Sequence, residues 1–313
     1  MMSGQYLLDD AKRFIHATLS NQIAKVSPTL YARLTKQTGR GFAPESAEQA
    51  ADYFQTCFRD YFDILGVPEH EIKSYLNGKQ LLEYGPGDVP GVALLMIAHG
   101  AKCVICVDRF ALVSMTQKNA DILLELLWRL DNSARARAAE CFLQPGNPFS
   151  GFNPERIRYL IQPDGLSKLK DEVDLVFSRA VLEHVNNLDA TFADMARALK
   201  ADAILLHQVD LKSHGLHRRN PLDFLTWPPA LWSWMHSHKG VPNRWRVNRY
   251  RDVMQRSGFE TLLLRPTDVV ESSVVHEVRP HLASPFKALS DDDLSWLGFW
   301  LIGRKTGAGS DST

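Results

Sequence analysis

The sequence has little that would place it in a membrane, outside the cell or on nucleic acid. Its 313 residues carry 36 lysines and arginines against 36 aspartates and glutamates, so no net field attracts an anionic partner. No stretch approaches the roughly 18 apolar residues of a transmembrane helix, and Asp9, Asp10 and Lys12 interrupt any secretion signal. We expect a cytoplasmic globular protein that does not act on nucleic acid.

Cysteine is also scarce, the four being Cys57, Cys103, Cys106 and Cys141. Cys103 and Cys106 have the spacing of a redox or metal pair, but they lie in KCVICVD, which we predict to be a buried strand. Residues three apart on a strand face opposite ways, so a shared disulfide or metal ion is not expected. We expect reduced thiols that pack in the core, in agreement with a cytoplasmic location.

What the sequence does contain is a regular alternation of strand and helix patterns. An apolar strand at residues 80–84 is followed by a helix at 89–99, a strand at 101–107 and a helix at 111–131. Such an alternation predicts an α/β, Rossmann-like fold, with a mostly parallel sheet and helices on both faces. The other predicted strands, which bring the sheet to seven, are residues 158–161, 173–177, 203–209, 259–264 and 297–303.

An N-terminal helical extension at residues 1–70 precedes the main domain, which we place at residues 71–305. The extension could cover a ligand or make a dimer contact, and the sequence does not decide the oligomeric state. Residues 306–313 are predicted to be a disordered tail. The apolar spacing predicts helices at residues 5–35 and 45–65 within the extension, and a short helix at 69–77 where the main domain begins.

Two segments of the main domain break the alternation. Residues 132–157, which contain several prolines and glycines, are predicted to be an irregular loop. Residues 211–247 follow the fifth strand and are rich in histidine, arginine, tryptophan and proline. Ligands of α/β proteins bind outside the carboxyl ends of the strands, so we expect this insertion to be a lid or a pocket wall.

The most specific motif is LLEYGPGDVPG, a glycine-rich turn between a strand and a helix. Gly85 and Gly87 allow backbone angles and close approach that a Cβ would block. Glu83 precedes the turn, and Asp108 ends the next strand, where it can accept hydrogen bonds from ribose hydroxyls. The turn lacks the third glycine of a dinucleotide motif. Asp88 would repel a pyrophosphate but suits a ligand that carries an ammonium and a sulfonium.

On these residues, the region 70–210 resembles the class I S-adenosylmethionine (SAM)-dependent methyltransferases. The glycine turn is similar to the family's first motif, although Pro86 and Val89 depart from it, and Asp108 matches the acidic residue that holds the ribose. The resemblance implies a Rossmann-like methyltransferase domain with SAM as cofactor and S-adenosyl-L-homocysteine as product.

Two further segments carry this resemblance. The sequence QPDG is similar to the loop whose acidic side chain, here Asp164, meets the adenine amino group. The sequence DLVFSRAVLEHV is similar to the fourth motif and implies that Ser178 lies beside the methionine portion. The predicted cofactor-binding residues are Glu83, Gly85, Gly87, Asp88, Asp108, Asp164, Gly165 and Ser178.

A histidine cluster after the fifth strand offers a base. Methyl transfer needs an aligned nucleophile and, for a hydroxyl acceptor, removal of its proton. In HQVDLKSHGLH, we predict that His207 or His214 is the general base and that Asp210 orients it. The cluster could instead bind a divalent metal, contact the substrate or have a purely structural role, and metal dependence is left open. His184, which follows the fourth motif, is a second catalytic candidate or a packing histidine.

The insertion after the fifth strand also interleaves arginines with tryptophans. Arginine forks bind carboxylates or phosphates, and indole faces stack on sugar rings. This mixture predicts an anionic, polyhydroxylated acceptor, although RNA bases could stack in the same way and the tryptophans could simply form the core of a lid. The predicted substrate-binding residues are Arg218, Asn220, Arg244, Trp245 and Arg246.

Residues 207–258 also resemble, more loosely, methyltransferases encoded with bacterial surface-polysaccharide and sugar-modifying enzymes. The motifs that carry this resemblance are HQVDL, NPLDFL and PNRWR. It implies a role in polysaccharide biosynthesis by O-methylation of a sugar hydroxyl. The alternatives are N-, C- or phenolic O-methylation of a small metabolite, a non-catalytic scaffold with the SAM fold and, more distantly, a nicotinamide oxidoreductase. The sequence names neither the acceptor nor the methylated atom.

Overall fold

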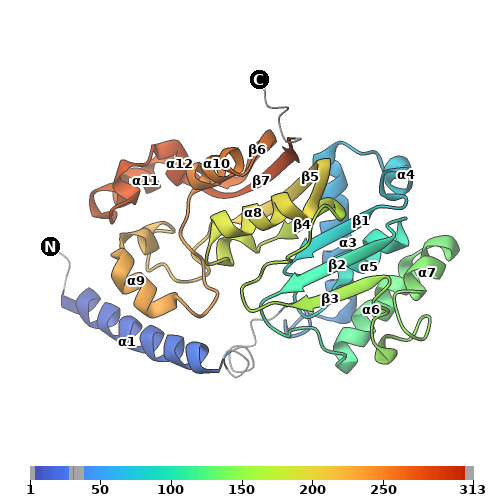
Figure 1. The fold of residues 1–313 in the computed structure, drawn as a ribbon. Helices are drawn as coiled ribbons and strands as arrows, with labels where there is room; N and C mark the ends of the chain where they lie inside the picture. The colour runs from blue at the N-terminus through green and yellow to red at the C-terminus, as the bar shows by residue number, and fades with distance from the viewer. Residues whose placement is uncertain (1–3, 28–30, 32–38, 307–313) are drawn as a thin grey trace, which may run out of the picture.

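A seven-stranded sheet runs through the centre of the structure (Figure 1). The computed structural model describes residues 4–27, 31 and 39–306. The strands are β1 Gln80–Tyr84, β2 Cys103–Asp108, β3 Ile157–Ile161, β4 Val173–Arg179, β5 Leu199–Asp210, β6 Phe259–Val269 and β7 Trp296–Lys305. Their order is β3-β2-β1-β4-β5-β7-β6; the first five are parallel, and β7 is antiparallel to both of its neighbours. The predicted mostly parallel α/β sheet is confirmed.

Helices cover both faces of this sheet, as predicted. The described α-helices are α1 Gly4–Val26, α3 Ala47–Leu65, α4 Ile72–Leu76, α5 Gly91–Ala98, α6 Gln117–Arg129, α7 Asn132–Ala139, α8 Leu188–Ala198, α9 Pro229–His236, α10 Val247–Arg256, α11 Ser272–Val278 and α12 Asp291–Ser295. Buried side chains of α3, α5 and α6 form one core with the sheet, and those of α8 and α10 form another on the opposite face (Figure 1).

Side-chain caps set the ends of several helices. Ser46 and Gln49 form a capping box at the start of α3, and Gly66 ends that helix in the left-handed conformation. The predicted helix at 111–131 begins later than expected, because the Thr116 side chain caps α6. The prediction of an irregular loop at 132–157 is wrong at its start, which forms helix α7. Asp131 caps this helix by accepting hydrogen bonds from two backbone amides.

A third core lies outside the sheet and joins two segments distant in sequence. Phe224 and Trp232, from the insertion after β5, pack with Val275 and Leu294 from the connection between β6 and β7. The sequence patterns did not predict helices in this connection, which holds α11 and α12. Phe14 of α1 packs against the same core. The predicted lid is therefore one wall of a helical layer beside the sheet.

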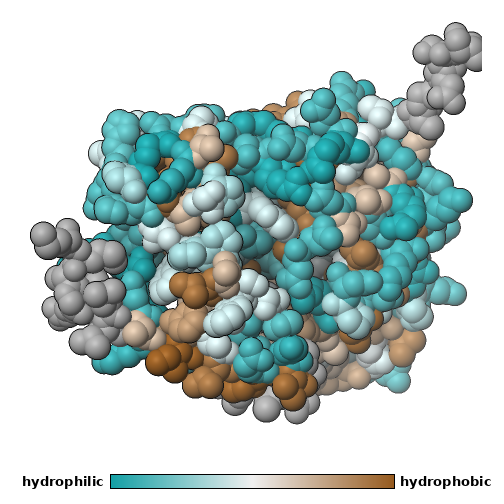
Figure 2. Space-filling model, turned by 60° about the vertical axis from the view of Figure 1, so that its left-hand side comes forward, coloured by the Kyte–Doolittle hydropathy of each residue, from teal (hydrophilic) through white to brown (hydrophobic). Residues whose placement is uncertain are grey.

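Helix α1 lies along α9 and also has an exposed apolar side. Figure 2 shows apolar residues gathered along the lower edge of the face that it draws. The exposed apolar residues of α1 and α9 are Ile15, Leu19, Ile23, Val26 and Trp234. Within the described part of the chain, every helix is too short or too polar to span a bilayer. The rest of the predicted first helix, at 28–30 and 32–35, and the predicted tail from 307 lie outside the described residues.

Candidate functional site

The turn between β1 and α5 lies where the sheet order reverses, since β1 has β2 on one side and β4 on the other. In an open α/β sheet this point forms a crevice at the carboxyl ends of the strands. Gly85 and Gly87 both have positive φ angles, of 63° and 73°. A Cβ on Gly85 would lie 2.5 Å from a methyl carbon of Val181, in the segment after β4. Only glycine therefore fits the first of these positions.

A cavity of about 400 Å³ adjoins this turn and has Glu83 in its wall. The Glu83 carboxyl is buried and accepts a hydrogen bond of 3.6 Å from the Cys106 thiol. Burial raises the pKa of Glu83 to about 8. Arg40 and Arg179 line the same cavity. The cavity thus offers a carboxyl and two guanidinium groups to a ligand with both an ammonium and a carboxylate, and the sequence motifs did not predict the two arginines.

Asp88, predicted to bind the cofactor, lies buried against residues 39–41, which precede α3. Its Oδ1 accepts a hydrogen bond of 3.2 Å from the Gly41 amide, and its backbone oxygen accepts one of 3.3 Å from Asn119. A Cβ on Gly39 would lie 2.1 Å from the same Oδ1. The side chain therefore anchors the N-terminal segment over the glycine turn, although it also belongs to the cavity wall.

Asp108 and Asp164 lie on adjacent loops at the carboxyl ends of β2 and β3. Asp108 Oδ1 accepts a hydrogen bond of 2.7 Å from the Arg109 amide, and burial raises the pKa of this carboxyl to about 6. Asp164 is exposed and forms an ion pair of 3.1 Å with Lys168. A Cβ on Gly165 would meet the Arg109 side chain at 3.0 Å. The structure thus brings the predicted ribose and adenine residues to one edge of the sheet.

Ser178 and His207 lie elsewhere, inside the core. Both are fully buried, and Ser178 Oγ lies 2.7 Å from His207 Nδ1. The His207 ring faces Phe192 of α8, with centroids 6.3 Å apart. Burial lowers the pKa of His207 to about 3. Neither side chain lines a cavity described here, so the structure does not bring them to the other predicted site residues.

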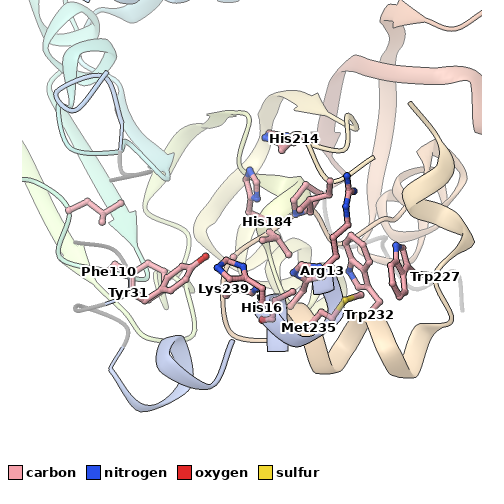
Figure 3. A pocket seen from close by; sticks show the side chains of 18 residues that line it. Arg13, His16, Tyr31, Phe110, His184, His214, Trp227, Trp232, Met235 and Lys239 are labelled. Atoms are coloured by element: carbon pink, nitrogen blue, oxygen red, sulfur yellow. Dashed lines mark hydrogen bonds between the residues drawn. The ribbon is translucent and has the colours of Figure 1, made fainter. Parts of the chain in front are cut away.

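A larger cavity, of about 830 Å³, opens at the carboxyl ends of β2, β4 and β5 (Figure 3). Phe110 follows Asp108 in the chain, so this cavity borders the predicted ribose site. His184 and His214 reach it from the segments after β4 and β5. A molecule bound in this cavity would therefore lie beside the crevice in which the predicted cofactor residues converge.

The opposite wall comes from α1, α9 and the turn after α9 (Figure 3). Arg13 and His16 project from α1, and Trp232 from α9. Lys239 donates hydrogen bonds to the Ala17 carbonyl (2.8 Å) and Ser20 Oγ (2.9 Å). Burial lowers its pKa to about 8. The described wall residues include no aspartate or glutamate, so the cavity favours an anionic occupant.

Two of the predicted catalytic residues, His184 and His214, meet at the wall of this cavity, and a third, Asp210, lies beside His214. The rings of His184 and His214 are in edge-to-face contact, with centroids 5.0 Å apart. Asp210 Oδ2 lies 3.8 Å from His214 Nε2. Glu183, which the sequence did not predict as a site residue, lies 3.7 Å from His184 Nε2 through its Oε1. Burial, and to a smaller extent the neighbouring His214, lowers the pKa of His184 to about 4. Burial raises the pKa of Glu183 well above its usual range.

The predicted substrate-binding residues do not line the larger cavity. Arg218 forms a two-bond ion pair with Asp10, at 2.7 and 2.8 Å. Arg244 donates to the Trp227 carbonyl at 2.7 Å, and the fully buried Arg246 donates to the carbonyls of three residues, Leu211, Leu294 and Trp296. Asn220 donates to the Val274 carbonyl, and Trp245 packs against the core. These side chains hold the insertion together.

A family model and several solved structures are similar to this chain. A family model described as a methyltransferase domain matches residues 59–264, well over half of the chain. An S-adenosylmethionine-dependent methyltransferase from Mesorhizobium loti has 18% identity, with 83% of this chain and 100% of that chain covered and a TM-score of 0.45.

Phosphoethanolamine N-methyltransferase 2 of Haemonchus contortus, solved with phosphomonomethylethanolamine and S-adenosylhomocysteine, has 14% identity, with 80% and 60% covered and a TM-score of 0.43. No curated protein matches the sequence at a significant level. The family match over the glycine turn and the parallel sheet identifies the chain as a member of the class I SAM-dependent methyltransferases.

Proposed function

We propose that this methyltransferase transfers the methyl group of SAM to a hydroxyl of an anionic, polyhydroxylated acceptor such as a saccharide. The observation that carries the proposal is the cavity of about 830 Å³, whose described wall has cationic and aromatic side chains and no carboxylate. Sugar rings stack on aromatic faces, and carboxylates or phosphates bind cations. Residues 211–247, which supply much of this wall, form the acceptor-binding insertion in this proposal.

The cofactor occupies the crevice at the carboxyl ends of β1, β2 and β3 in this proposal. SAM, when bound, supplies a methyl group on a sulfonium. Asp108 accepts hydrogen bonds from the ribose hydroxyls, and the Asp164–Gly165 loop contacts the adenine. The cavity beside the glycine turn takes the methionine portion, with Glu83 toward its ammonium. The buried carboxyl of Glu83 fits this role, because a nearby cation would favour its ionised form.

The acceptor is held from the side of α1 and α9. Lys239 keeps its ammonium at neutral pH, since its pKa of about 8 is still above 7. Arg13 lies on the same wall, where its guanidinium donates to the His217 carbonyl at 3.3 Å. Trp227 and Trp232 add indole faces. These groups orient an anionic sugar so that one hydroxyl points toward the crevice, and orientation of this kind is the main contribution of a protein to an in-line transfer.

Oxygen is favoured as the methylated atom by the cluster of His184, His214 and Asp210. A hydroxyl is a weak nucleophile until its proton is removed, whereas a free amine needs no such help. The two imidazoles lie at the cavity wall, on the segments that follow β4 and β5. The cluster is therefore placed to act on the acceptor proton.

Radiolabelled SAM and a panel of acceptors test this proposal. The panel pairs nucleotide-linked uronic acids with their neutral sugars and adds a catechol, an amine and an acidic carbon compound. We expect label transfer to an acidic sugar, with weaker transfer to its neutral partner and none with Asp108→Ala. Transfer to the amine, the carbon acid or the catechol would overturn the saccharide proposal. Binding of S-adenosylhomocysteine without transfer to any acceptor would favour the scaffold alternative.

A further inference from the structure

Glu183 is a buried carboxyl without a hydrogen-bond partner. It belongs to the short 3-10 helix Leu182–His184 after β4, and the residue is 1% exposed. Neither Oε1 nor Oε2 has a hydrogen-bond partner among the described residues. A carboxyl taken out of water without donors is costly, so buried carboxyls are normally bonded, paired or bound to a metal ion. A bound cation beside Glu183 would lower the cost of burying its ionised form.

Two imidazoles lie within reach of the same carboxyl. One ligand atom from each of Glu183, His184 and His214 can be chosen so that all three atoms lie within 4.8 Å of one another. His214 has a φ angle of 51°, in the left-handed region that non-glycine residues avoid. In this conformation the His214 ring lies edge to face with the His184 ring, with centroids 5.0 Å apart. The three groups come from two different loops.

We propose that Glu183, His184 and His214 bind a divalent transition-metal ion, Zn²⁺ by preference, at the wall of the larger cavity. Two imidazole nitrogens and one carboxylate oxygen form a ligand set that suits zinc, whereas Mg²⁺ and Ca²⁺ prefer oxygen ligands alone. Bonds of about 2.1 Å bring ligand atoms to roughly 3.4 Å from one another, so the three groups close by about 1 Å. His214 has the freedom to do this, because its side chain is 35% exposed.

The protein supplies three ligands, so one position of a tetrahedral site stays open toward the cavity. Building on the proposed function, that position takes the acceptor hydroxyl and lowers its pKa. The hydroxyl releases its proton to water, its oxygen forms a bond to the methyl carbon, and the carbon–sulfur bond breaks. The electron pair of that bond stays on sulfur, which leaves as neutral S-adenosylhomocysteine.

Zinc binding by untagged, chelator-treated protein tests the site directly. We expect calorimetry to give one Zn²⁺ per chain, and a titration with Co²⁺ to give the visible spectrum of a low-symmetry site with nitrogen and oxygen ligands. Glu183→Gln and His214→Ala should each weaken zinc binding by at least about tenfold. The matched control is His16→Ala, an imidazole on the same cavity outside the cluster, which should keep the wild-type zinc affinity.

Thermal unfolding and S-adenosylhomocysteine binding show whether each variant is folded. Wild-type protein that binds no zinc, or folded Glu183→Gln and His214→Ala variants that both keep wild-type zinc affinity, would overturn the metal site. The proposed function would survive that result if label transfer to an acidic sugar were still seen. Zinc binding at the cluster without transfer to any saccharide would keep the site and reject the proposed acceptor instead.

Discussion

Ser178 and His207, on the neighbouring parallel strands β4 and β5, share a buried hydrogen bond of 2.7 Å between Oγ and Nδ1. The sequence motifs connect both residues to the reaction, one beside the cofactor and one as a base. In the structure, both face α8 rather than either cavity. The pKa of about 3 means that His207 is neutral throughout the physiological range. The bond therefore joins two strands of the core.

Replacing Ser178 with alanine should reduce stability without affecting the cofactor. The substitution leaves His207 Nδ1 buried without a partner, which costs roughly 1–3 kcal/mol of unfolding free energy. Denaturant unfolding measures this loss, and calorimetry with S-adenosylhomocysteine measures the affinity. A tenfold or larger fall in affinity, with stability unchanged, would instead support the position beside the methionine portion that the fourth motif implies.

Replacing Asp108 with asparagine should weaken cofactor binding. A carboxylate that accepts two ribose hydroxyls forms charge-assisted hydrogen bonds, and their loss costs roughly 1.5–3 kcal/mol, or about 10- to 100-fold in affinity. Calorimetry with S-adenosylhomocysteine measures the change. Asp121→Asn, at a half-buried position of α6 where the carboxylate accepts a hydrogen bond from Gln117, is the control and should bind normally. Equal affinities for the Asp108 variant and wild type would remove Asp108 from the cofactor site.

The affinity for S-adenosylhomocysteine should also fall at acidic pH. Burial holds the pKa of Asp108 at about 6 without ligand, and only the ionised carboxylate accepts two hydrogen bonds from the ribose. The contribution of Asp108 to the affinity should therefore be full well above pH 6 and decline as the pH falls through that value. In the Asp108→Asn variant this decline should be absent. A decline of the same size in the variant would assign it to another group.

The parts of this fold that depend on local sequence could be predicted. Gly85 and Gly87 follow an apolar strand, and this short pattern was enough to predict a turn at the carboxyl end of that strand. Asp108 and Asp164 could be placed by the same rule, because each follows the carboxyl end of a strand. His184 and His214 lie 30 residues apart in the sequence. Because each follows the carboxyl end of a strand, both could be predicted to lie near the site.

Contacts between distant segments could not be predicted. Arg13 and Lys239 meet at one cavity only because α1 packs on α9, and no local pattern records that packing. The arginines of the insertion were predicted to bind the acceptor, and no local pattern shows that Asp10 and backbone carbonyls are their partners in the structure. Arg246 looks like a free cation in the sequence, but three carbonyls from two separate segments, one after β5 and one at the junction of α12 and β7, surround its guanidinium. The composition of the insertion showed which charged and aromatic side chains are present, but it did not show which atoms they hydrogen-bond.

Replacing Arg246 with methionine should therefore destabilise the fold. Methionine keeps much of the side-chain length but leaves the buried carbonyls of Leu211 and Leu294 without these donors, at a cost of about 3 kcal/mol. Denaturant unfolding provides the measurement. The control is Arg265→Met, at an exposed position of β6, which should stay within roughly 0.5 kcal/mol of wild type. Unchanged stability with a raised KM would return Arg246 to the acceptor site.

Replacing Lys239 with methionine should raise the KM for an acidic acceptor and leave the affinity for S-adenosylhomocysteine unchanged. Its ammonium faces a cavity without described carboxylates, so its loss removes attraction for an anion.

The pH dependence of the KM follows from the Lys239 pKa of about 8, because the ammonium is present below that pH and lost above it. The wild-type KM for an acidic sugar should therefore rise as the pH passes 8, while the KM for the neutral partner sugar stays level. The variant should show the high KM at every pH. If the variant instead kept the same rise near pH 8, the titrating group would lie elsewhere, and Lys239 would be only a support for α1 through its bonds to Ala17 and Ser20.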